Sequence, residues 1–431
     1  MNLQNARGTR DFLPEQQLLR QRIADTLRRV FELYGYSPVD TPALERFEIL
    51  SSKYAGGEEI LKETFKVSDQ GGRELGLRYD LTVPLARLVA MNPTLKMPFK
   101  RYQIEKVWRD GPVQAGRYRE FMQCDVDVVG VASMAADAEI LALISAALAQ
   151  LGMKGIIKFN NVKLLRGILD FAGVEKSKTD TVILSLDKLE KLGEEPVKKE
   201  LQKKGVPKEA IKVLLGIFSI TGTAGKTIQE LRKEVRNPLA AEGLAEIEEV
   251  LSYCGKLDVD ATLDIRLARG LSYYTSTVFE TFLIGSSIKS SVCSGGRYDR
   301  MIGMFLGTER SYPAVGTAFG LDRLYDALLE KEKGSRKTPV VVYVIPIGLI
   351  DQAMRTAERL RQDGIATDID LSSRGVGKSL EYANSQRIPY AVLVGKEELS
   401  QKKVKLRNMK SGEEKLVAVE EVKEFLTEKN K

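Results

Sequence analysis

The sequence of 431 residues predicts an α+β domain with an antiparallel sheet, interrupted by a helical insertion and followed by a smaller α/β domain. Three observations support this fold class. Strand-like segments in the first third are joined by polar loops, which is typical of antiparallel pairing. Residues 161–256 are rich in Lys, Glu and Leu at helical spacing. After a charged linker, strands and helices alternate, which indicates a partly parallel sheet.

The elements of the first part follow from periodicity. Residues 16–34 place apolar side chains at helical spacing, and Gly35 is typical of the end of a helix. Residues 75–90 and 99–131 are predicted to be strands joined by polar loops, and the stretch MQCDVDVVGV alternates as a half-buried antiparallel strand does. An Ala- and Leu-rich helix is predicted over 134–151.

The remaining elements set the domain boundaries. Strand-like patterning returns after residue 260, and a helix is expected from about Gly320 to Lys331. The segment that follows is charged and contains Gly and Pro, which is typical of a linker. We therefore expect the α+β domain at 1–160 and 257–331, the helical insertion at 161–256, the linker at 332–339 and the α/β domain at 340–431.

The composition excludes several kinds of chemistry. The chain contains no histidine, so Ser-His-Asp and Cys-His catalysis, HExxH zinc sites and a histidine base are impossible. A metal ion would have to be bound by carboxylates and phosphates, which favours Mg²⁺. The cysteines form no CxxC pair, and this argues against a disulfide framework and suits a reducing compartment. They are Cys124, Cys254 and Cys293.

Charge and hydropathy indicate the surroundings of the protein. A net charge of +7 and a pI near 9.0 are compatible with a polyanionic partner or with an ordinary, slightly basic protein. The first residues lack the apolar stretch of a secretory signal, and no apolar run reaches 18 residues. We therefore expect a cytoplasmic protein without a membrane span.

Two glycine-containing segments resemble phosphate-binding loops. TGTAGKT at 221–227 has Ile220 where the Walker pattern requires a glycine, so a turn that begins a helix is the better interpretation. SRGVGKS at 373–379 fails in the same way. Because it places Arg374 and Lys378 at the start of a helix, it is either a phosphate contact or a simple solvated helix cap.

Three arginines lie in strand-like or glycine-flanked apolar segments instead of on polar surfaces: Arg109, Arg269 and Arg323. A guanidinium group binds phosphate oxygens through two parallel, charge-assisted hydrogen bonds. Several converging arginines therefore indicate a triphosphate site.

Carboxylates accompany these arginines on strand-like segments. Asp125 and Asp127 alternate along one strand, so both point to the same face, and Asp80 lies on an earlier segment. Such an acidic face requires a cation, either Mg²⁺ or a substrate ammonium group. From the pattern alone we infer a nucleotide-using enzyme on an antiparallel sheet, while a solvated strand face remains the simpler alternative.

At this point a resemblance becomes specific. The chain resembles the histidyl-tRNA synthetase family, a family of class II aminoacyl-tRNA synthetases, over nearly its whole length. GTRDF and YGYSPVDTPALE resemble the N-terminal motif and class II motif 1, VWRDGPVQAGRYREFMQCDVDVVG resembles motif 2, and AVGTAFGLDRL resembles motif 3. LARGLSYYTSTVFE and SGGRYDRMIG resemble the two motifs that are specific to histidine enzymes. The α/β domain resembles the family's anticodon-binding domain.

The resemblance implies a histidine–tRNA ligase that works as a homodimer. It would activate L-histidine with ATP and Mg²⁺ to histidyl-adenylate and then charge tRNA(His). The carboxylate of the amino acid attacks the α-phosphorus of ATP, and both groups are anionic, so positive charge must be placed between them. Arginine and magnesium suffice for this, and an enzyme without histidine is chemically acceptable.

The resemblance also implies roles for individual residues. Arg109 falls at the position that binds the α-phosphate and the amino-acid carboxylate, and Arg269 at the family's own arginine on the α-phosphate. Arg323 corresponds to the γ-phosphate ligand, and Arg117 is a weaker ATP contact.

The amino-acid pocket is implied in the same way. Asp80, Thr82 and Gln123 fall where the family binds the α-ammonium group. Asp127 and Tyr274 fall where it binds the two imidazole nitrogens. Two further tyrosines, Tyr273 and Tyr298, are additional pocket candidates.

The sequence departs from the family pattern in motif 2 and in the first histidine motif. Motif 2 usually has a glutamate two residues after its arginine, where this chain has Gly111. The family usually has an acidic residue directly after RGL, where this chain has Ser272. Gln114 lies in the loop expected to contact the tRNA acceptor end, and that loop contains no basic residue between Arg109 and Arg117.

Three alternative functions remain open. The first is the regulatory subunit of ATP phosphoribosyltransferase, which uses the same catalytic fold as a binding module and lacks the C-terminal domain. The second is the histidine-sensing domain of a translation-control kinase, although no kinase motif is present. The third is a synthetase for another amino acid, which the two histidine motifs disfavour.

Overall fold

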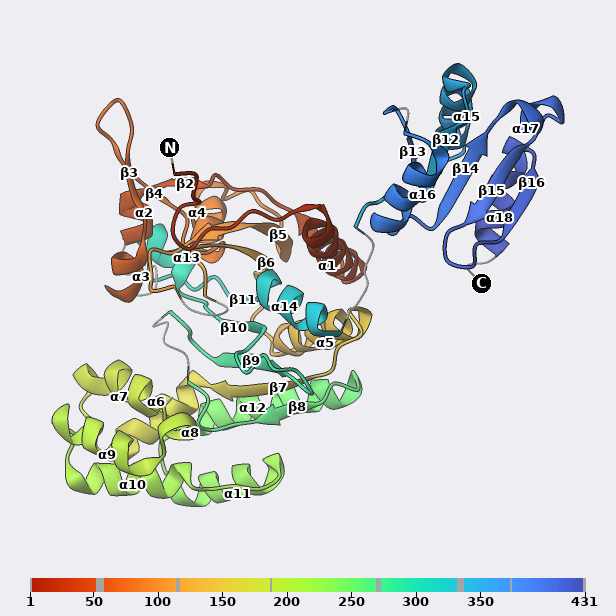
Figure 1. The fold of residues 1–431 in the computed structure, drawn as a ribbon. Helices are drawn as coiled ribbons and strands as arrows, with labels where there is room; N and C mark the ends of the chain where they lie inside the picture. The colour runs from red at the N-terminus through yellow and green to blue at the C-terminus, as the bar shows by residue number, and fades with distance from the viewer. Residues whose placement is uncertain are drawn as a thin grey trace. The chain divides into compact units, whose positions relative to one another are not determined.

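The computed structural model describes residues 2–51, 58–113, 117–186, 188–268, 273–331, 337–372 and 374–428. It divides into two compact units, Met1–Arg10 with Arg22–Lys331 and Asp11–Gln21 with Glu332–Lys431. Each unit has its own sheet (Figure 1).

The first unit is built on a large, mostly antiparallel sheet. Within the described residues it has eight strands in the order β1-β5-β6-β11-β10-β9-β7-β8. Only the two outermost pairs, β1 with β5 and β7 with β8, are parallel. The predicted antiparallel fold is thereby confirmed. The strands are β1 (Ser37–Pro38), β5 (Phe99–Trp108), β6 (Glu120–Val129), β7 (Gly155–Asn161), β8 (Ala261–Leu263), β9 (Thr277–Leu283), β10 (Cys293–Arg297) and β11 (Ala314–Gly320).

Helices cover one face of this sheet. The alternation along β6 turns Cys124, Val126 and Val128 away from Asp125 and Asp127. On the apolar face, the ring of Phe31 lies 5.7 Å from that of Tyr102 and 5.8 Å from that of Phe319. The opposite face is therefore left for polar side chains. The covering helices are α1 (Pro14–Leu33), α5 (Ala135–Gln150) and α14 (Leu321–Lys331), which lie together in Figure 1.

The prediction of strands over 75–90 is largely wrong. Only Glu74–Leu77 (β4) is a strand, and Thr82–Met91 forms the helix α4. Residue Asp80 explains the difference, because its carboxylate accepts hydrogen bonds from the backbone N–H groups of Thr82 and Val83 and so begins a helix. A short apolar run suits either structure, and burial at helical spacing decided it.

A small sheet with two short helices lies next to this segment. Its strands are β2 (Leu44–Arg46), β4 and β3 (Lys66–Ser68), in the order β2-β4-β3. The helices are α2 (Phe47–Ser51) and α3 (Glu58–Glu63).

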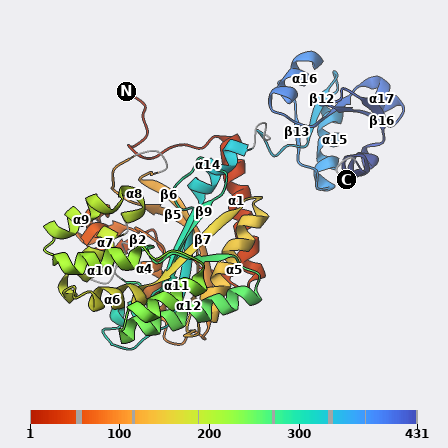
Figure 2. The same cartoon turned by 90° about the horizontal axis from the view of Figure 1, so that it is seen from below.

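The predicted helical region between the sheet strands is confirmed. It follows β7 and forms a layer of its own in Figures 1 and 2. Its last helix, α12, packs against α6 of the same region and against α5, which covers the sheet. The elements are α6 (Val162–Phe171), η1 (Lys176–Lys178), α7 (Thr179–Leu186), α8 (Leu189–Leu192), α9 (Glu194–Lys203), α10 (Lys208–Phe218), α11 (Ala224–Glu234) and α12 (Pro238–Lys256). The short helix α13 (Met301–Phe305) belongs to the sheet region.

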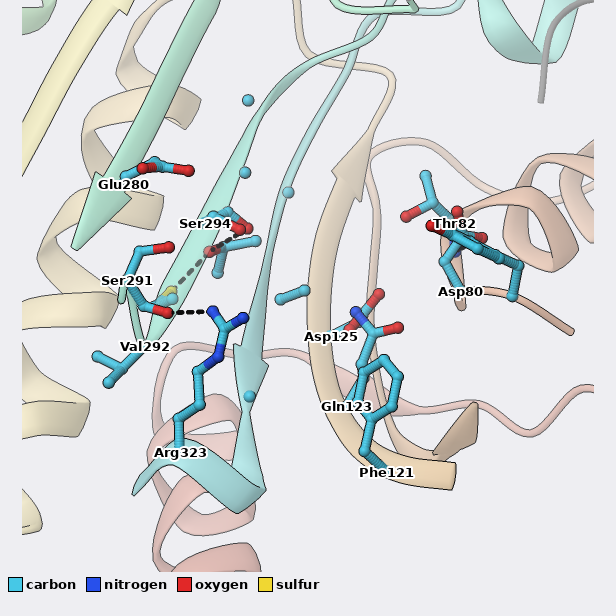
Figure 3. A pocket seen from close by; sticks show the side chains of 18 of the residues that line it. Asp80, Thr82, Phe121, Gln123, Asp125, Glu280, Ser291, Val292, Ser294 and Arg323 are labelled. Carbon is cyan, nitrogen blue, oxygen red and sulfur yellow. Dashed lines mark hydrogen bonds between the residues drawn. The ribbon is translucent and has the colours of Figure 1, made fainter. Parts of the chain in front are cut away.

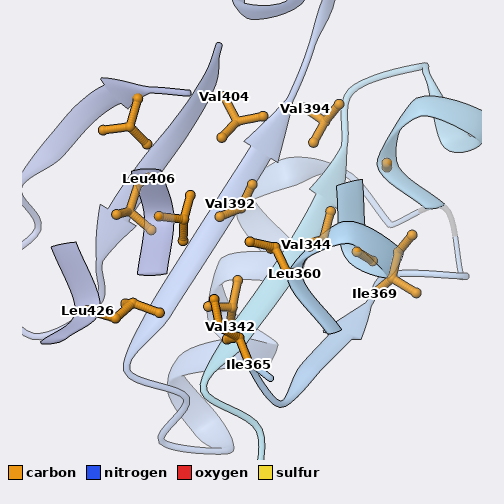
Figure 4. Packing of buried hydrophobic residues seen from close by; sticks show 14 residues of the cluster. Val342, Val344, Leu360, Ile365, Ile369, Val392, Val394, Val404, Leu406 and Leu426 are labelled. Carbon is orange, nitrogen blue, oxygen red and sulfur yellow. The ribbon is translucent and has the colours of Figure 1, made fainter. Parts of the chain in front are cut away.

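The second unit has a mixed five-stranded sheet in the order β13-β12-β14-β15-β16. The first three strands are parallel, which confirms the predicted partly parallel sheet, and the last two are antiparallel. Aliphatic side chains such as Val344, Val392 and Leu360 fill the core between this sheet and its helices (Figure 4). The elements are β12 (Val342–Pro346), α15 (Ile350–Gln362), β13 (Thr367–Ile369), α16 (Val376–Ser385), β14 (Tyr390–Val394), α17 (Lys396–Ser400), β15 (Val404–Asn408), β16 (Glu414–Val417), η2 (Val419–Glu421) and α18 (Val422–Glu428).

Candidate active site

A pocket of about 530 Å³ opens on the polar face of the large sheet. Strands β6, β9, β10 and β11 form its floor and walls (Figure 3). It gathers eleven of the residues that the sequence singled out. These are Asp80, Thr82, Arg109, Arg117, Gln123, Asp125, Asp127, Tyr273, Tyr274, Tyr298 and Arg323.

Three aspartates make one end of the pocket acidic. Asp80, Asp125 and Asp127 are all less than 9% exposed. Burial raises the pKa of each carboxyl group, most strongly that of Asp125. The nearby Arg101 opposes this rise at all three. A cationic group entering the pocket would therefore stabilise carboxylates that burial disfavours.

Asp127 is held from three sides. Its Oδ2 atom lies 2.7 Å from Nη2 of Arg101 on β5, and its Oδ1 atom accepts a hydrogen bond of 2.6 Å from the hydroxyl of Tyr298. Gly316 lies opposite on β11, where a Cβ atom would come within 1.8 Å of Oδ1. The carboxylate therefore has one position, and a glycine at 316 is required for it.

Three tyrosines line the same pocket as this carboxylate. The rings of Tyr273 and Tyr274 are 4.7 Å apart, and Tyr273 meets Tyr298 edge to face at 6.2 Å. Gly296 lies beside Tyr274, where a Cβ atom would come within 2.9 Å of the ring. Aromatic walls with a carboxylate at the back can hold a flat ring that carries an N–H group.

Next to the tyrosines, polar side chains form a subsite that would accept a cationic group. Asp80 is fixed by the start of α4, and Thr82 follows it in the same turn. Gln123 is 8% exposed, and its Oε1 atom has no hydrogen-bond partner among the described residues. Asp125 lies beside Gln123 in Figure 3 and likewise has an unpartnered oxygen, Oδ1, in that set. Unpartnered buried acceptors favour a ligand with several donors.

Arg109 lies between two aromatic rings. Its guanidinium carbon is 4.1 Å from the ring centre of Tyr79 and 5.0 Å from that of Phe121, and its Nε atom donates to the Tyr79 carbonyl at 3.2 Å. These contacts orient the guanidinium group and leave its terminal nitrogens for an anion.

Arg117 contacts the carboxylate of Glu63, a residue that the sequence did not single out. Glu63 also accepts a hydrogen bond of 3.2 Å from the hydroxyl of Tyr79. A Cβ atom on Gly111 would come within 2.7 Å of the Glu63 carboxylate. The glycine that departs from the motif 2 pattern therefore leaves room for a carboxylate from α3.

Arg323 marks the other end of the pocket. Its Nη1 atom donates to the carbonyl of Ser291, which orients the guanidinium group toward β10 (Figure 3). Glu280 on β9 lines the same wall. The pocket thus combines buried carboxylates with arginines, of which Arg109 lies close to Asp80 and Arg323 lies at the other end.

Several predicted residues lie elsewhere. Arg269, Ser272 and Gln114 fall outside the described residues. Arg374 and Lys378 lie in the second unit, at the start of α16, where both are exposed. The guanidinium group of Arg374 lies 4.6 Å from the ring centre of a tyrosine on the same helix.

Sequence reasoning missed Arg101 as a pocket-supporting residue. A signal for it existed, because Arg101 on β5 lies an even number of positions before Arg109, which directly follows this strand, and alternation places such positions on one face of the sheet. No comparable signal pointed to Glu63, because its contact with Arg117 joins segments 54 residues apart.

The antiparallel sheet and a pocket lined by both buried carboxylates and arginines define the class. This is the catalytic fold of class II aminoacyl-tRNA synthetases. The sequence model described as histidyl-tRNA synthetase matches residues 8–324, and that of the anticodon binding domain matches residues 340–429. The chain belongs to the histidyl-tRNA synthetase family.

Known proteins agree with this assignment. Histidine–tRNA ligase 1 of Bacillus cereus is 44% identical over 429 residues, which cover 99% of this chain and 100% of the relative. Histidine–tRNA ligase 2 of Shouchella clausii is 42% identical and covers 96% and 98%. The crystal structure of histidyl-tRNA synthetase from Nostoc sp. superposes with a TM-score of 0.86 at 32% identity, covering 98% of this chain and 99% of that one.

A further structure has a double description. It is titled an ATP phosphoribosyltransferase regulatory subunit/histidyl-tRNA synthetase from Bacillus halodurans. It matches with a TM-score of 0.74 at 25% identity and covers 89% of this chain and 97% of that one.

Proposed function

We propose that this chain is a histidine–tRNA ligase that activates L-histidine with ATP and transfers it to the 3′ end of tRNA(His). One observation supports this above all others: a single pocket combines an acidic end, where Asp80 and Asp127 lie, with Arg109 and Arg323. An amino acid and a triphosphate need these two environments at adjoining positions.

The acidic end suits the two cationic or donating parts of histidine. Asp80, Thr82 and the Oε1 atom of Gln123, which has no hydrogen-bond partner in the described part of the chain, would bind the α-ammonium group. Asp127 would accept the N–H of the imidazole, and Tyr274 would bind the other nitrogen. Because these polar groups are buried, an apolar side chain of similar shape would leave them unpaired and be rejected.

The arginines suit adenylate formation. A carboxylate oxygen of histidine forms a bond to the α-phosphorus, and the bond from that phosphorus to the oxygen of the leaving pyrophosphate breaks. Arg109 and Arg269 would lower the repulsion between the two anions, and Arg117 and Arg323 would bind the departing phosphates. No proton transfer by a protein base is required.

Mg²⁺ would enter with the triphosphate. The part of the chain that is described contains no group of three or more Cys, Asp or Glu residues able to hold a metal ion. Phosphate oxygens would therefore supply most ligands, and Glu280 on the pocket wall could add a carboxylate oxygen. When bound, the ion would neutralise charge on the phosphates.

The tRNA would contact both units. The second unit corresponds to the anticodon binding domain. Arg374 and Lys378 at the start of α16 would contact phosphates of the tRNA. Gln114 in the motif 2 loop would contact the acceptor end.

The assembly and location extend the same proposal. We expect a homodimer in the cytoplasm, as the family resemblance implies. None of the described helices is both long and apolar enough to cross a lipid bilayer.

Pyrophosphate exchange with each of the twenty amino acids tests this function. We expect exchange with histidine alone, and a loss of about 100- to 1,000-fold in Arg323→Ala, because one charged donor to the transition state is removed. Arg46→Ala is the matched control, since Arg46 is exposed and does not line the pocket.

The outcome also separates the alternative role. Binding of histidine without any exchange would contradict a ligase and would indicate a regulatory subunit of the kind named in the Bacillus halodurans structure.

A further inference from the structure

Arg101 is among the largest fully buried side chains of the protein, and it lies directly behind the candidate imidazole site. Its exposed fraction is 0%, and its position on β5 is opposite Asp127 on β6. The Nη2 atom is 2.7 Å from Oδ2 of Asp127 and donates a 3.0 Å hydrogen bond to the Leu81 carbonyl. Burying a guanidinium group is costly unless a carboxylate pairs with it, and here that carboxylate is the one of Asp127.

The hydrogen bonds that Asp127 can form do not select between a neutral and a protonated imidazole ring in the ligand, so the selection depends on the charges nearby. A carboxylate accepts an N–H from either imidazole or imidazolium. A tyrosine hydroxyl such as that of Tyr274 donates to a bare nitrogen and equally accepts from a protonated one. Hydrogen-bond geometry alone therefore does not distinguish the two forms. Arg101 distinguishes the two forms, because its guanidinium group already pairs with the Asp127 carboxylate that an imidazolium ring would need as its partner.

We propose that Arg101 is a positioning residue that holds Asp127 as a charge-compensated carboxylate, so that the pocket selects histidine with a neutral imidazole ring. This inference rests on the proposed function, because it concerns the histidine site of that reaction. The acidic groups Asp80 and Asp125 remain for the α-ammonium group. The selected ligand thus has one cationic group and one neutral ring.

The groups that face Asp127 come from every neighbouring element. Arg101 is on β5, Asp125 on β6, Tyr298 follows β10, Tyr274 precedes β9, Asp80 precedes α4, and the buried Tyr36 follows α1. Among them Asp125 is the group whose titration could imitate the expected effect, since burial raises its pKa well above the ordinary range. The test therefore includes an Asp125→Asn background.

The experiment measures the dissociation constant of histidine by calorimetry between pH 5.5 and 8, without ATP. In the native chain we expect it to rise about tenfold per pH unit below the ordinary imidazole pKa of about 6.5, with protons released on binding. In Arg101→Met we expect binding weakened by roughly tenfold or more at pH 8. Its pH dependence should be flat or reversed, because an imidazolium then supplies the missing cation.

Two variants separate positioning from folding. Arg101→Lys keeps the charge and should keep the native pH slope. Arg297→Met removes the guanidinium group from a second buried pair, that with Asp137, which does not line the pocket. It should lower stability and leave the slope unchanged.

Each result has one meaning. A slope in Arg101→Met parallel to that of the native chain, also in the Asp125→Asn background, would overturn the inference. If Arg101→Met does not fold, the native chain still decides, because uptake of protons on binding at pH 6 would show that imidazolium is preferred. If the native chain does not bind histidine at all, the proposed function itself fails.

Discussion

Gly316 shows how a residue without a side chain shapes the site. It pairs with Asp127 across β6 and β11, and the space above it is filled by the Asp127 carboxylate. Asp125, two residues before Asp127, pairs with Ala318 in the same register. A small residue on β11 therefore lies opposite each buried carboxylate, and the strand pairing converts a sequence of alternating aspartates into a pocket floor.

Gly316→Ala should weaken histidine binding by roughly tenfold or more, since a Cβ atom 1.8 Å from Oδ1 would displace the Asp127 carboxylate. The Michaelis constant for ATP should change little in pyrophosphate exchange. Gly320→Ala on the same strand is the control, because its Cβ atom would meet its nearest neighbour at an ordinary 3.6 Å. Equal effects of the two substitutions would contradict this explanation.

The buried carboxyl group of Asp125 predicts a pH dependence of stability. Burial raises its pKa above the ordinary value, so the folded chain keeps a proton that the unfolded chain has lost. Its contribution to stability therefore decreases as the pH rises above about 4, toward the raised pKa.

Asp125→Asn should accordingly stabilise the protein by about 1–3 kcal/mol at pH 8 and by less at pH 5, while histidine binding weakens. Thermal unfolding at the two pH values measures this. Asp137→Asn provides the contrast: it removes the buried carboxylate that pairs with Arg297, which then keeps Asp299 as its remaining ion partner among the described residues, and should lower stability. A lower melting temperature for Asp125→Asn at pH 8 would show that the carboxylate is compensated in the fold.

At the scale of elements, α6 and α12 pack unusually close. A Cβ atom on Gly167 would lie 2.4 Å from the backbone nitrogen of Ala240, and one on Gly243 would lie 2.5 Å from that of Leu164. Two glycines thus let the helix backbones touch. This contact joins the first and last long helices of the helical region. The chain therefore leaves the sheet after β7 and re-enters it at the neighbouring strand β8.

Gly243→Val should destabilise the protein by about 2–4 kcal/mol, because the added side chain meets backbone that cannot move aside. Gly255→Ala in the same helix has no neighbour within 4 Å and should stabilise by about 0.5–1 kcal/mol through helix propensity. Urea unfolding of both variants measures the difference. If Gly243→Val were as stable as the native chain, the helices would not be in contact at this position.

At the scale of the whole molecule, two units with separate cores divide the task. The first unit contains the pocket, and the second corresponds to the anticodon binding domain. The net charge of +7 suits a polyanionic substrate that must reach both. Small substrates need only the first unit, so conditions that weaken long-range attraction should affect the two half-reactions differently.

Raising the salt concentration from 50 to 200 mM should therefore increase the Michaelis constant for tRNA(His) by tenfold or more, because the release of counterions from the tRNA on binding is less favourable at higher salt. Histidine-dependent pyrophosphate exchange, measured under the same conditions, should change by less than about threefold, since its charges are buried and poorly screened. A parallel decline of both activities would mean that salt acts on the fold and not on tRNA binding.

The absence of histidine also has a consequence for the whole chain. A ligase for histidine that contains none can be translated without charged tRNA(His), so its synthesis should continue during histidine starvation. Ribosome profiling under histidine limitation measures this. Synthesis that falls in step with that of histidine-containing proteins would contradict the hypothesis.

The sequence by itself determined the fold class and the family, and it singled out many of the residues that line the pocket. Alternation along β6 and the motif residues Arg109 and Arg323 are local patterns, and local patterns are visible without coordinates. The helix α4 was misassigned because a short apolar run fits both helix and strand, and only its burial decided between them. The tertiary structure alone decided the pairing of Arg101 with Asp127 and of Glu63 with Arg117. Strand register and packing bring these residues together, and they depend on contacts between distant segments that no window of the sequence contains.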